Sequence, residues 1–165
     1  MMNRLTKTGL GGALLMLAAC GGPAGQPEAG TAQGNLAGAR IGGPFTLTDQ
    51  DGAKRSWSDF KGKYRIVYFG YTYCPDVCPV DLQRIAQGYR LFEKQAPDRA
   101  AKVQPIFITL DPERDTPEVV KNYVSAFHPK LIGLTGTPGE IAAVAKAFVV
   151  VYMKEKPEGS AGYLV

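Results

Sequence analysis

Residues 64–94 read YRIVYFGYTYCPDVCPVDLQRIAQGYRLFEK, and they give the strongest indication of the fold class. The run at residues 64–70 is rich in β-branched and aromatic residues, which predicts a buried central strand. Over residues 77–94 the apolar residues recur at helical spacing instead, which predicts a helix. Its expected apolar face consists of Leu82, Ile85, Ala86, Tyr89 and Phe92. Cys74 and Cys78 lie between the two elements, where the strand passes into the helix.

The rest of the globular sequence continues this alternation of strands and helices. Further strands are predicted at residues 45–48, 53–57, 103–110, 131–134 and 148–153. Asp51-Gly52 is a turn signal, so the first two of these should form a β-hairpin. Thr116-Pro117 and the capping box at residues 137–140 each predict the start of a helix. The pattern predicts an α/β fold with a mainly parallel sheet that helices cover on both faces.

The first residues carry the signals of an exported lipoprotein. Arg4 and Lys7 precede an apolar run at residues 9–19. That run is shorter than the roughly 20 residues that a membrane-spanning helix needs, but it has the length of a secretory leader. It ends in Leu-Ala-Ala-Cys, which resembles a bacterial lipobox with Cys20 as the lipidated N-terminus. An ordinary signal peptide cut just before this cysteine is the alternative.

Three segments follow from these signals. We expect a lipoprotein signal peptide at residues 1–19, a lipidated N-terminus and flexible linker at residues 20–39, and one globular domain at residues 40–165. The lipid would hold that domain on the periplasmic side of a bacterial membrane. Of the charged residues, 17 basic and 15 acidic ones lie outside the leader, and they form no basic run. We therefore expect no nucleic acid among the partners.

The spacing of the cysteine pair indicates its chemistry. Export leads to an oxidising compartment, where Cys74 and Cys78 are the two cysteines not assigned to lipid. A thiol at a helix N-terminus is stabilised as the thiolate, which binds metals and attacks disulfides. Residues four apart on a helix have Cβ atoms about 5–6 Å apart, whereas a disulfide needs about 3.8 Å. The spacing favours a soft metal such as Cu(I), with a structural disulfide or thiol exchange as alternatives.

Three motifs together resemble the Sco/SenC family. They occupy residues 68–79 (YFGYTYCPDVCP), 111–117 (DPERDTP) and 131–136 (LIGLTG), and they keep the family's order and separation. The resemblance implies a thioredoxin-like fold with an added N-terminal β-hairpin. It also implies a copper metallochaperone, rather than a turnover enzyme, that serves the dinuclear copper centre of cytochrome c oxidase. Two alternatives stay open: a thiol–disulfide oxidoreductase that reduces the acceptor cysteines, and a redox sensor.

The resemblance also implies the copper ligands and the partners. Both cysteines and one histidine hold copper in this family, so Cys74 and Cys78 are the implied ligands and form the redox-active pair. The implied partners are the oxidase subunit with the dinuclear copper centre, and other periplasmic copper carriers or thiol reductants. Asp115 and Asp76 are candidates for the outer shell of the site or for contact with a partner. Tyr71 and Tyr73 are expected to shield the site or to face a partner, with packing against the sheet as the alternative.

The expected histidine is the point where the sequence departs from the family. It should follow a Tyr-Leu-x-Asp-His-like run, and residues 163–165 match only the start of that run. We therefore expect the third ligand, the closing strands and the last helix to be missing, which would expose apolar surface and favour self-association. Two thiolates suffice for Cu(I), but Cu(II) also prefers nitrogen, so Cu(II) binding should be weak. His128 is expected to be a structural loop residue and Met153 a core residue.

Overall fold

The computed structural model describes residues 38–156, 158–159 and 162–165, and its compact unit spans Ala39–Val165. The expected signal peptide, the lipidated cysteine Cys20 and almost all of the linker lie outside the described residues. Within the described part, no helix has the length and apolar character needed to cross a membrane.

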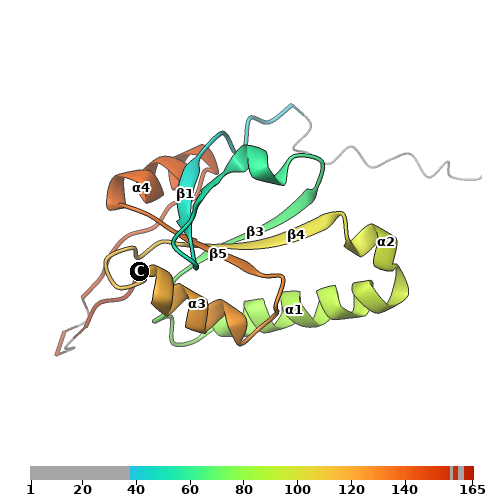
Figure 1. Ribbon diagram of the computed structural model, residues 1–165. Helices are drawn as coiled ribbons and strands as arrows, with labels where there is room; N and C mark the ends of the chain where they lie inside the picture. Colours follow the sequence, from blue (N-terminus) through green and yellow to red (C-terminus); the bar gives the residue numbers. More distant parts are fainter. Residues whose placement is uncertain (1–37, 157, 160–161) are drawn as a thin grey trace, which may run out of the picture. The chain divides into compact units, whose positions relative to one another are not determined.

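A five-stranded mixed sheet forms the centre of the domain (Figure 1). In spatial order its strands are β2 (Lys54–Ser56), β1 (Thr46–Asp49), β5 (Ile132–Thr135), β4 (Val103–Thr109) and β3 (Tyr64–Gly70). Strands β3, β4 and β5 are parallel, and β1 joins β5 in the antiparallel sense. The pairing of β1 with β2 confirms the predicted N-terminal hairpin.

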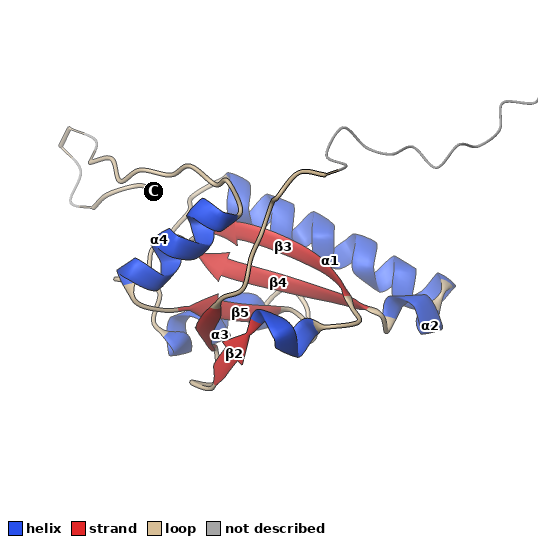
Figure 2. Ribbon diagram, turned by 90° about the horizontal axis from the view of Figure 1, so that it is seen from above, coloured by secondary structure: helices blue, strands red, loops and turns tan. Residues whose placement is uncertain are grey.

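Helices cover both faces of this sheet (Figure 2). On one face lie α1 (Val77–Gln95) and α3 (Pro117–Ser125), with the short α2 (Pro97–Ala100) following α1. The other face carries α4 (Pro138–Ala147) and the 3-10 turn η1 (Trp57–Phe60). Neighbouring residues of β4 point to opposite faces of the sheet, because side chains alternate along a strand. Phe107 joins the cluster under α1 and α3, and Ile108 joins the cluster under α4.

The predicted helix starts are confirmed. Thr116 caps α3, with its hydroxyl accepting a hydrogen bond from the N–H of Val119. At α4, Thr137 and Glu140 bond each other's main-chain N–H groups in a reciprocal capping box. Helix α3 packs closely on β5 because Gly133 has no side chain there: a Cβ atom would lie 2.3 Å from Val120 Cγ1.

The predicted central position of β3 is wrong for the part of the chain that the structure describes. Here β3 pairs only with β4 and forms an edge of the sheet. Its first residue, Tyr64, is 76% exposed, and Ile66 is 39% exposed. An apolar run predicts a strand, but its place among the other strands depends on pairings that the run does not encode.

The strand predicted at residues 148–153 is also absent from the described residues. After α4, Val149 adopts a φ of 58°, in the left-handed region, and the chain leaves the sheet. The isolated bridge between Glu155 and Leu164 lies beyond this segment, and within the described residues no strand pairs with residues 148–153. Met153 is 62% exposed, so its predicted place in the core is wrong. Without a neighbouring strand, half of an extended apolar segment faces solvent.

Candidate functional site

Cys74 and Cys78 lie at the carboxyl end of β3, where the chain enters α1 (Figure 1). Cys78 belongs to the first turn of the helix, and Cys74 precedes the helix by three residues. The side chain of Cys78 is only 4% exposed, whereas Cys74 is partly exposed. Both cysteines are free thiols. Because of the difference in exposure, the sulfur of Cys74 is accessible from solvent, whereas that of Cys78 lies in the core.

Main-chain N–H groups at the start of α1 converge on the sulfur of Cys74. The N–H of Cys78 donates to Cys74 Sγ at 3.4 Å, and the N–H groups of Asp76 and Val77 also bond this sulfur. Burial raises the pKa of Cys74, but the hydrogen bond from the Cys78 thiol and these N–H groups outweigh it. The pKa of Cys74 therefore lies below its ordinary value, as expected for a thiol at a helix N-terminus.

Cys78 has the opposite character. Burial raises the pKa of Cys78 to about 11, and the hydrogen bond that its thiol donates to Cys74 acts in the same direction. The N–H of Tyr71 and the hydroxyl of Tyr68 oppose this rise by bonding the sulfur. The pair thus combines one accessible sulfur that ionises readily with one buried sulfur that keeps its proton.

Gly70 makes room for the buried sulfur. A Cβ atom at Gly70 would lie 3.1 Å from Cys78 Sγ, 2.9 Å from Tyr68 Cε1 and 3.3 Å from Phe107 Cε2. Any side chain at this position would displace the sulfur or the rings beside it. Gly70 and Tyr68 both belong to the motif at residues 68–79, but neither was predicted as a residue of the site.

Asp115 supports the loop that carries Cys74. Its carboxylate accepts hydrogen bonds from the N–H of Thr72 at 2.9 Å, from the hydroxyl of Thr72 at 2.6 Å and from the hydroxyl of Thr109 at 2.5 Å. These bonds tie the loop, two residues before Cys74, to the end of β4. Because Asp115 is 0% exposed, its side chain does not reach a partner, and the geometry favours the supporting role.

The other candidates near the pair differ in exposure. Asp76 occupies the N-cap position of α1, makes no capping hydrogen bond and is exposed. Tyr71 is buried beside the site, whereas Tyr73 is 56% exposed. Of the two tyrosines expected to shield the site, only Tyr71 is therefore enclosed, and Tyr73 and Asp76 face outward.

A cluster around Arg114 holds Tyr163 against the segment that follows β4, and no motif in the sequence predicted these contacts. Arg114 donates through Nε to Asp111 and through Nη1 to the carbonyl oxygen of Tyr163 at 3.0 Å. The hydroxyl of Tyr163 donates to Asp111 Oδ1 at 2.7 Å. The guanidinium also lies 3.7 Å from the ring centre of Tyr163 and 4.9 Å from that of Tyr73. The run DPERD at residues 111–115 indicates charged side chains at this place, but it does not indicate which residues they bind.

His128 has a structural role, as predicted. Its Nε2 pairs with Glu93 at 3.1 Å, and its Nδ1 accepts a hydrogen bond from the N–H of Lys130 at 3.1 Å. Both ring nitrogens are thus engaged, and the residue is 4% exposed. Among the described residues, no three His, Cys, Asp or Glu side chains are grouped as they would be around a metal ion. The described site therefore offers two sulfur donors.

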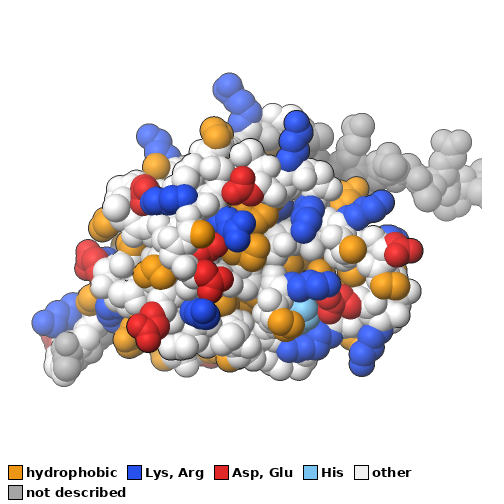
Figure 3. Space-filling model, viewed as in Figure 1, with side chains coloured by type: hydrophobic (Ala, Val, Ile, Leu, Met, Phe, Trp, Pro, Cys, Tyr) orange, Lys and Arg blue, Asp and Glu red, His pale blue; other side chains and the backbone are white. Residues whose placement is uncertain are grey.

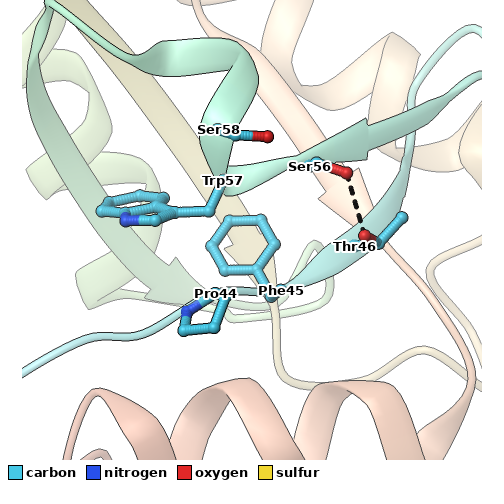
Figure 4. A pocket seen from close by; sticks show the side chains of 6 residues that line it. All are labelled: Pro44, Phe45, Thr46, Ser56, Trp57 and Ser58. Carbon is cyan, nitrogen blue, oxygen red and sulfur yellow. Dashed lines mark hydrogen bonds between the residues drawn. The ribbon is translucent and has the colours of Figure 1, made fainter.

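A hollow of about 430 Å³ lies away from the cysteines, on the N-terminal hairpin (Figure 4). It is lined by Pro44, Phe45, Thr46, Ser56, Trp57 and Ser58. The hydroxyls of Thr46 and Ser56 bond each other at 2.9 Å, and no lining side chain titrates near neutral pH or binds metals. On the face shown in Figure 3, basic and acidic side chains are interspersed.

Known proteins resemble this chain in sequence and in structure. The family model described as SCO1/SenC matches residues 33–165. Protein SCO1 homolog 1, mitochondrial, of Arabidopsis thaliana is 48% identical over 127 residues, which cover 77% of this chain and 37% of that protein. Protein SenC of Rhodobacter capsulatus is 46% identical over 121 residues, which cover 73% of this chain and 53% of that protein.

A solved structure extends the likeness to the fold. The structure of Bradyrhizobium japonicum ScoI with copper bound is 48% identical to this chain and superposes with a TM-score of 0.68. The match covers 75% of this chain and 76% of that one. The chain spans between a third and somewhat over half of the length of the two curated relatives named above.

Proposed function

The chain belongs to the SCO1/SenC family, and we propose that it is a membrane-anchored copper metallochaperone whose cargo is held by Cys74 and Cys78. Its fold is thioredoxin-like, as predicted, which agrees with the structural likeness to Sco proteins. The observation that carries the proposal is the pair of free thiols at the start of α1, where the N–H of Cys78 donates to Cys74 Sγ at 3.4 Å. Two soft sulfur ligands suit Cu(I) better than harder ions.

Loading the pair is a proton-coupled exchange. Each thiol loses its proton to solvent as the sulfur binds Cu(I), and the resulting complex carries one net negative charge. Cys74 gives up its proton readily because its pKa is lowered. Cys78 gives up its proton less readily, and the metal–sulfur bond compensates for that cost. Binding should therefore strengthen with rising pH through the neutral range.

The proposed acceptor is the dinuclear copper centre of cytochrome c oxidase. A ligand of the acceptor would reach Cys74 first, because that sulfur is accessible and the other is buried. Tyr73 and Val77 flank it and are 56% and 59% exposed, which leaves an apolar rim for contact. A lipid on Cys20 and a tether at residues 21–39 would keep the domain near its acceptor, on the periplasmic side of a bacterial membrane.

A second candidate function is reduction of the acceptor's cysteines. The opposite pKa shifts of the two thiols favour it, because thiol exchange uses one accessible thiolate to attack and a second thiol to resolve the mixed disulfide. The pair would end as a disulfide, with two electrons passed to the substrate disulfide. An external thiol reductant would then have to restore it.

A competition titration separates these functions. The reduced full chain is titrated with Cu(I) against a chelator, beside a variant carrying both Cys74→Ser and Cys78→Ser. Cys20→Ser is the control for the third cysteine, because it removes the proposed lipid attachment and leaves the pair untouched. We expect one Cu(I) per chain in the wild type and the control, and loss of binding in the double variant.

Other outcomes would contradict the proposal. Undiminished binding in the double variant would place copper elsewhere. A folded wild type that binds no Cu(I) but reduces a cysteine-pair substrate would favour the second function. A strong Cu(II)–thiolate absorption band would refute the preference for Cu(I) that two soft sulfur ligands imply.

A further inference from the structure

Tyr68 lies next to Cys78, the buried cysteine of the pair. It stands on β3, and its hydroxyl donates a hydrogen bond to Asp81 Oδ2 on α1 at 3.2 Å. That distance is long for a bond from a hydroxyl to a carboxylate, which is usually 2.5–2.7 Å. The side chain of Asp81 is 45% exposed, so water also competes for its oxygens. The bond between Tyr68 and Asp81 is therefore a weak one.

The ring of Tyr68 also lies beside the sulfur of Cys78. The ring edge of Tyr68 and Cys78 Sγ converge at Gly70, 2.9 Å and 3.1 Å from the place where a Cβ atom of that glycine would lie. The Tyr68 hydroxyl favours the ionised form of Cys78, and the thiol in turn raises the pKa of Tyr68. A tyrosine has one phenolic proton, so Asp81 and Cys78 compete for it.

We propose that Tyr68 is a positioning residue for the copper-loaded pair, and that its hydroxyl turns from Asp81 to the sulfur of Cys78 when copper binds. The inference rests on the proposed function. In the loaded state the sulfurs share a net negative charge, and Cys78 is too buried for water to solvate it. The main-chain N–H of Tyr71 supplies one hydrogen bond to this sulfur, and Tyr68 supplies the second. Asp81 loses little, because water replaces the bond it gives up.

The direct test is Tyr68→Phe, which removes the hydroxyl and keeps the ring. Tyr123→Phe is the matched control: the Tyr123 ring packs 5.5 Å from that of Phe107, and its buried hydroxyl has no hydrogen-bond partner within the described residues. Cu(I) affinity of the full chain should fall about tenfold or more in Tyr68→Phe, as is typical when a partner of a metal ligand is lost, and stay unchanged in the control.

Two further readouts distinguish positioning from a loss of structure. The Cu(I)–thiolate absorption in the ultraviolet should move to longer wavelength in Tyr68→Phe, because a sulfur that loses a hydrogen bond has higher-energy lone pairs. Asp81→Ala should raise Cu(I) affinity severalfold by releasing the hydroxyl. In the Tyr68→Phe background the same change should have little effect, because there is no hydroxyl to release.

Each outcome decides the question. Equal affinities for Tyr68→Phe and wild type would overturn the inference and leave the proposed function intact. An equal gain from Asp81→Ala in both backgrounds would also overturn it, since the carboxylate would then act on the sulfur directly. A folded wild type that binds no Cu(I) would overturn the proposed function and, with it, this inference.

Discussion

Asp115→Asn should lower both the stability of the domain and its affinity for copper, although it only replaces one carboxylate oxygen by an NH2 group. The buried carboxylate accepts three hydrogen bonds, two from Thr72 and one from Thr109. An asparagine presents one acceptor oxygen and an NH2 group. The amide oxygen can keep the bonds from the N–H of Thr72 and the hydroxyl of Thr109, and the hydroxyl of Thr72 then turns to accept from the NH2 group. All three bonds lose the contribution of the carboxylate charge, and bonds to a neutral amide are weaker by about 1 kcal/mol each.

Together these terms predict a loss of about 2–4 kcal/mol, after allowing for the lower cost of burying a neutral amide. Urea unfolding of the full chain measures it as a lower midpoint with an unchanged slope. Asp98→Asn is the control, since Asp98 is exposed, and should change stability by less than about 0.5 kcal/mol. Cu(I) affinity should fall about tenfold, because the weaker bonds to Thr72 anchor the loop that holds Cys74 less firmly.

The result that would refute this reasoning is a variant that unfolds at the wild-type urea concentration. The carboxylate would then be replaceable by an amide, and the three hydrogen bonds would contribute nothing that depends on its charge. A variant that is destabilised but binds Cu(I) as tightly as the wild type would separate the two roles. Asp115 would then stabilise the domain without positioning the cysteine loop.

Two further predictions test the packing and the asymmetry of the site. Gly133→Ala should destabilise the domain by at least about 2 kcal/mol in urea unfolding, because the added Cβ would lie 2.3 Å from a valine methyl group of α3. Gly139→Ala is the control and should not destabilise the domain, because a Cβ at that position meets no atom within 4 Å. Equal effects of the two substitutions would contradict the packing argument. Iodoacetamide at neutral pH should alkylate Cys74 well before Cys78, because Cys74 is more exposed and has the lower pKa. Mass spectrometry of the labelled peptides gives the order of alkylation. Equal rates of labelling at the two cysteines would refute the predicted asymmetry.

Local chemistry made much of the fold predictable. The caps at Thr116 and Thr137, the turn at Asp51-Gly52 and the helical spacing after the cysteines all depend on residues within a few positions of one another. The structure confirms each of them within a residue or two. The place of Cys74 at the start of a helix was predictable for the same reason.

Pairing between distant segments was not predictable from such signals. Residues 64–70 were recognised as a strand, but their edge position in the described sheet depends on which other strands reach them. The apolar run at residues 148–153 looked like a strand, yet no neighbouring strand pairs with it in the described part of the chain. Met153 is exposed for that reason, although its residue type favours the core.

The α/β class, the hairpin, the family resemblance and the identity of the two thiols follow from the sequence, because composition, spacing and motifs carry them. The folded domain was needed to see that Cys78 is the buried thiol and Cys74 the accessible one, that Asp115 holds Thr72, and that the ring of Tyr68 lies beside Cys78. These features involve residues that are distant along the chain. Burial, shared protons and pKa shifts arise where β3, β4 and α1 meet, and the register that brings them together is a property of the whole fold.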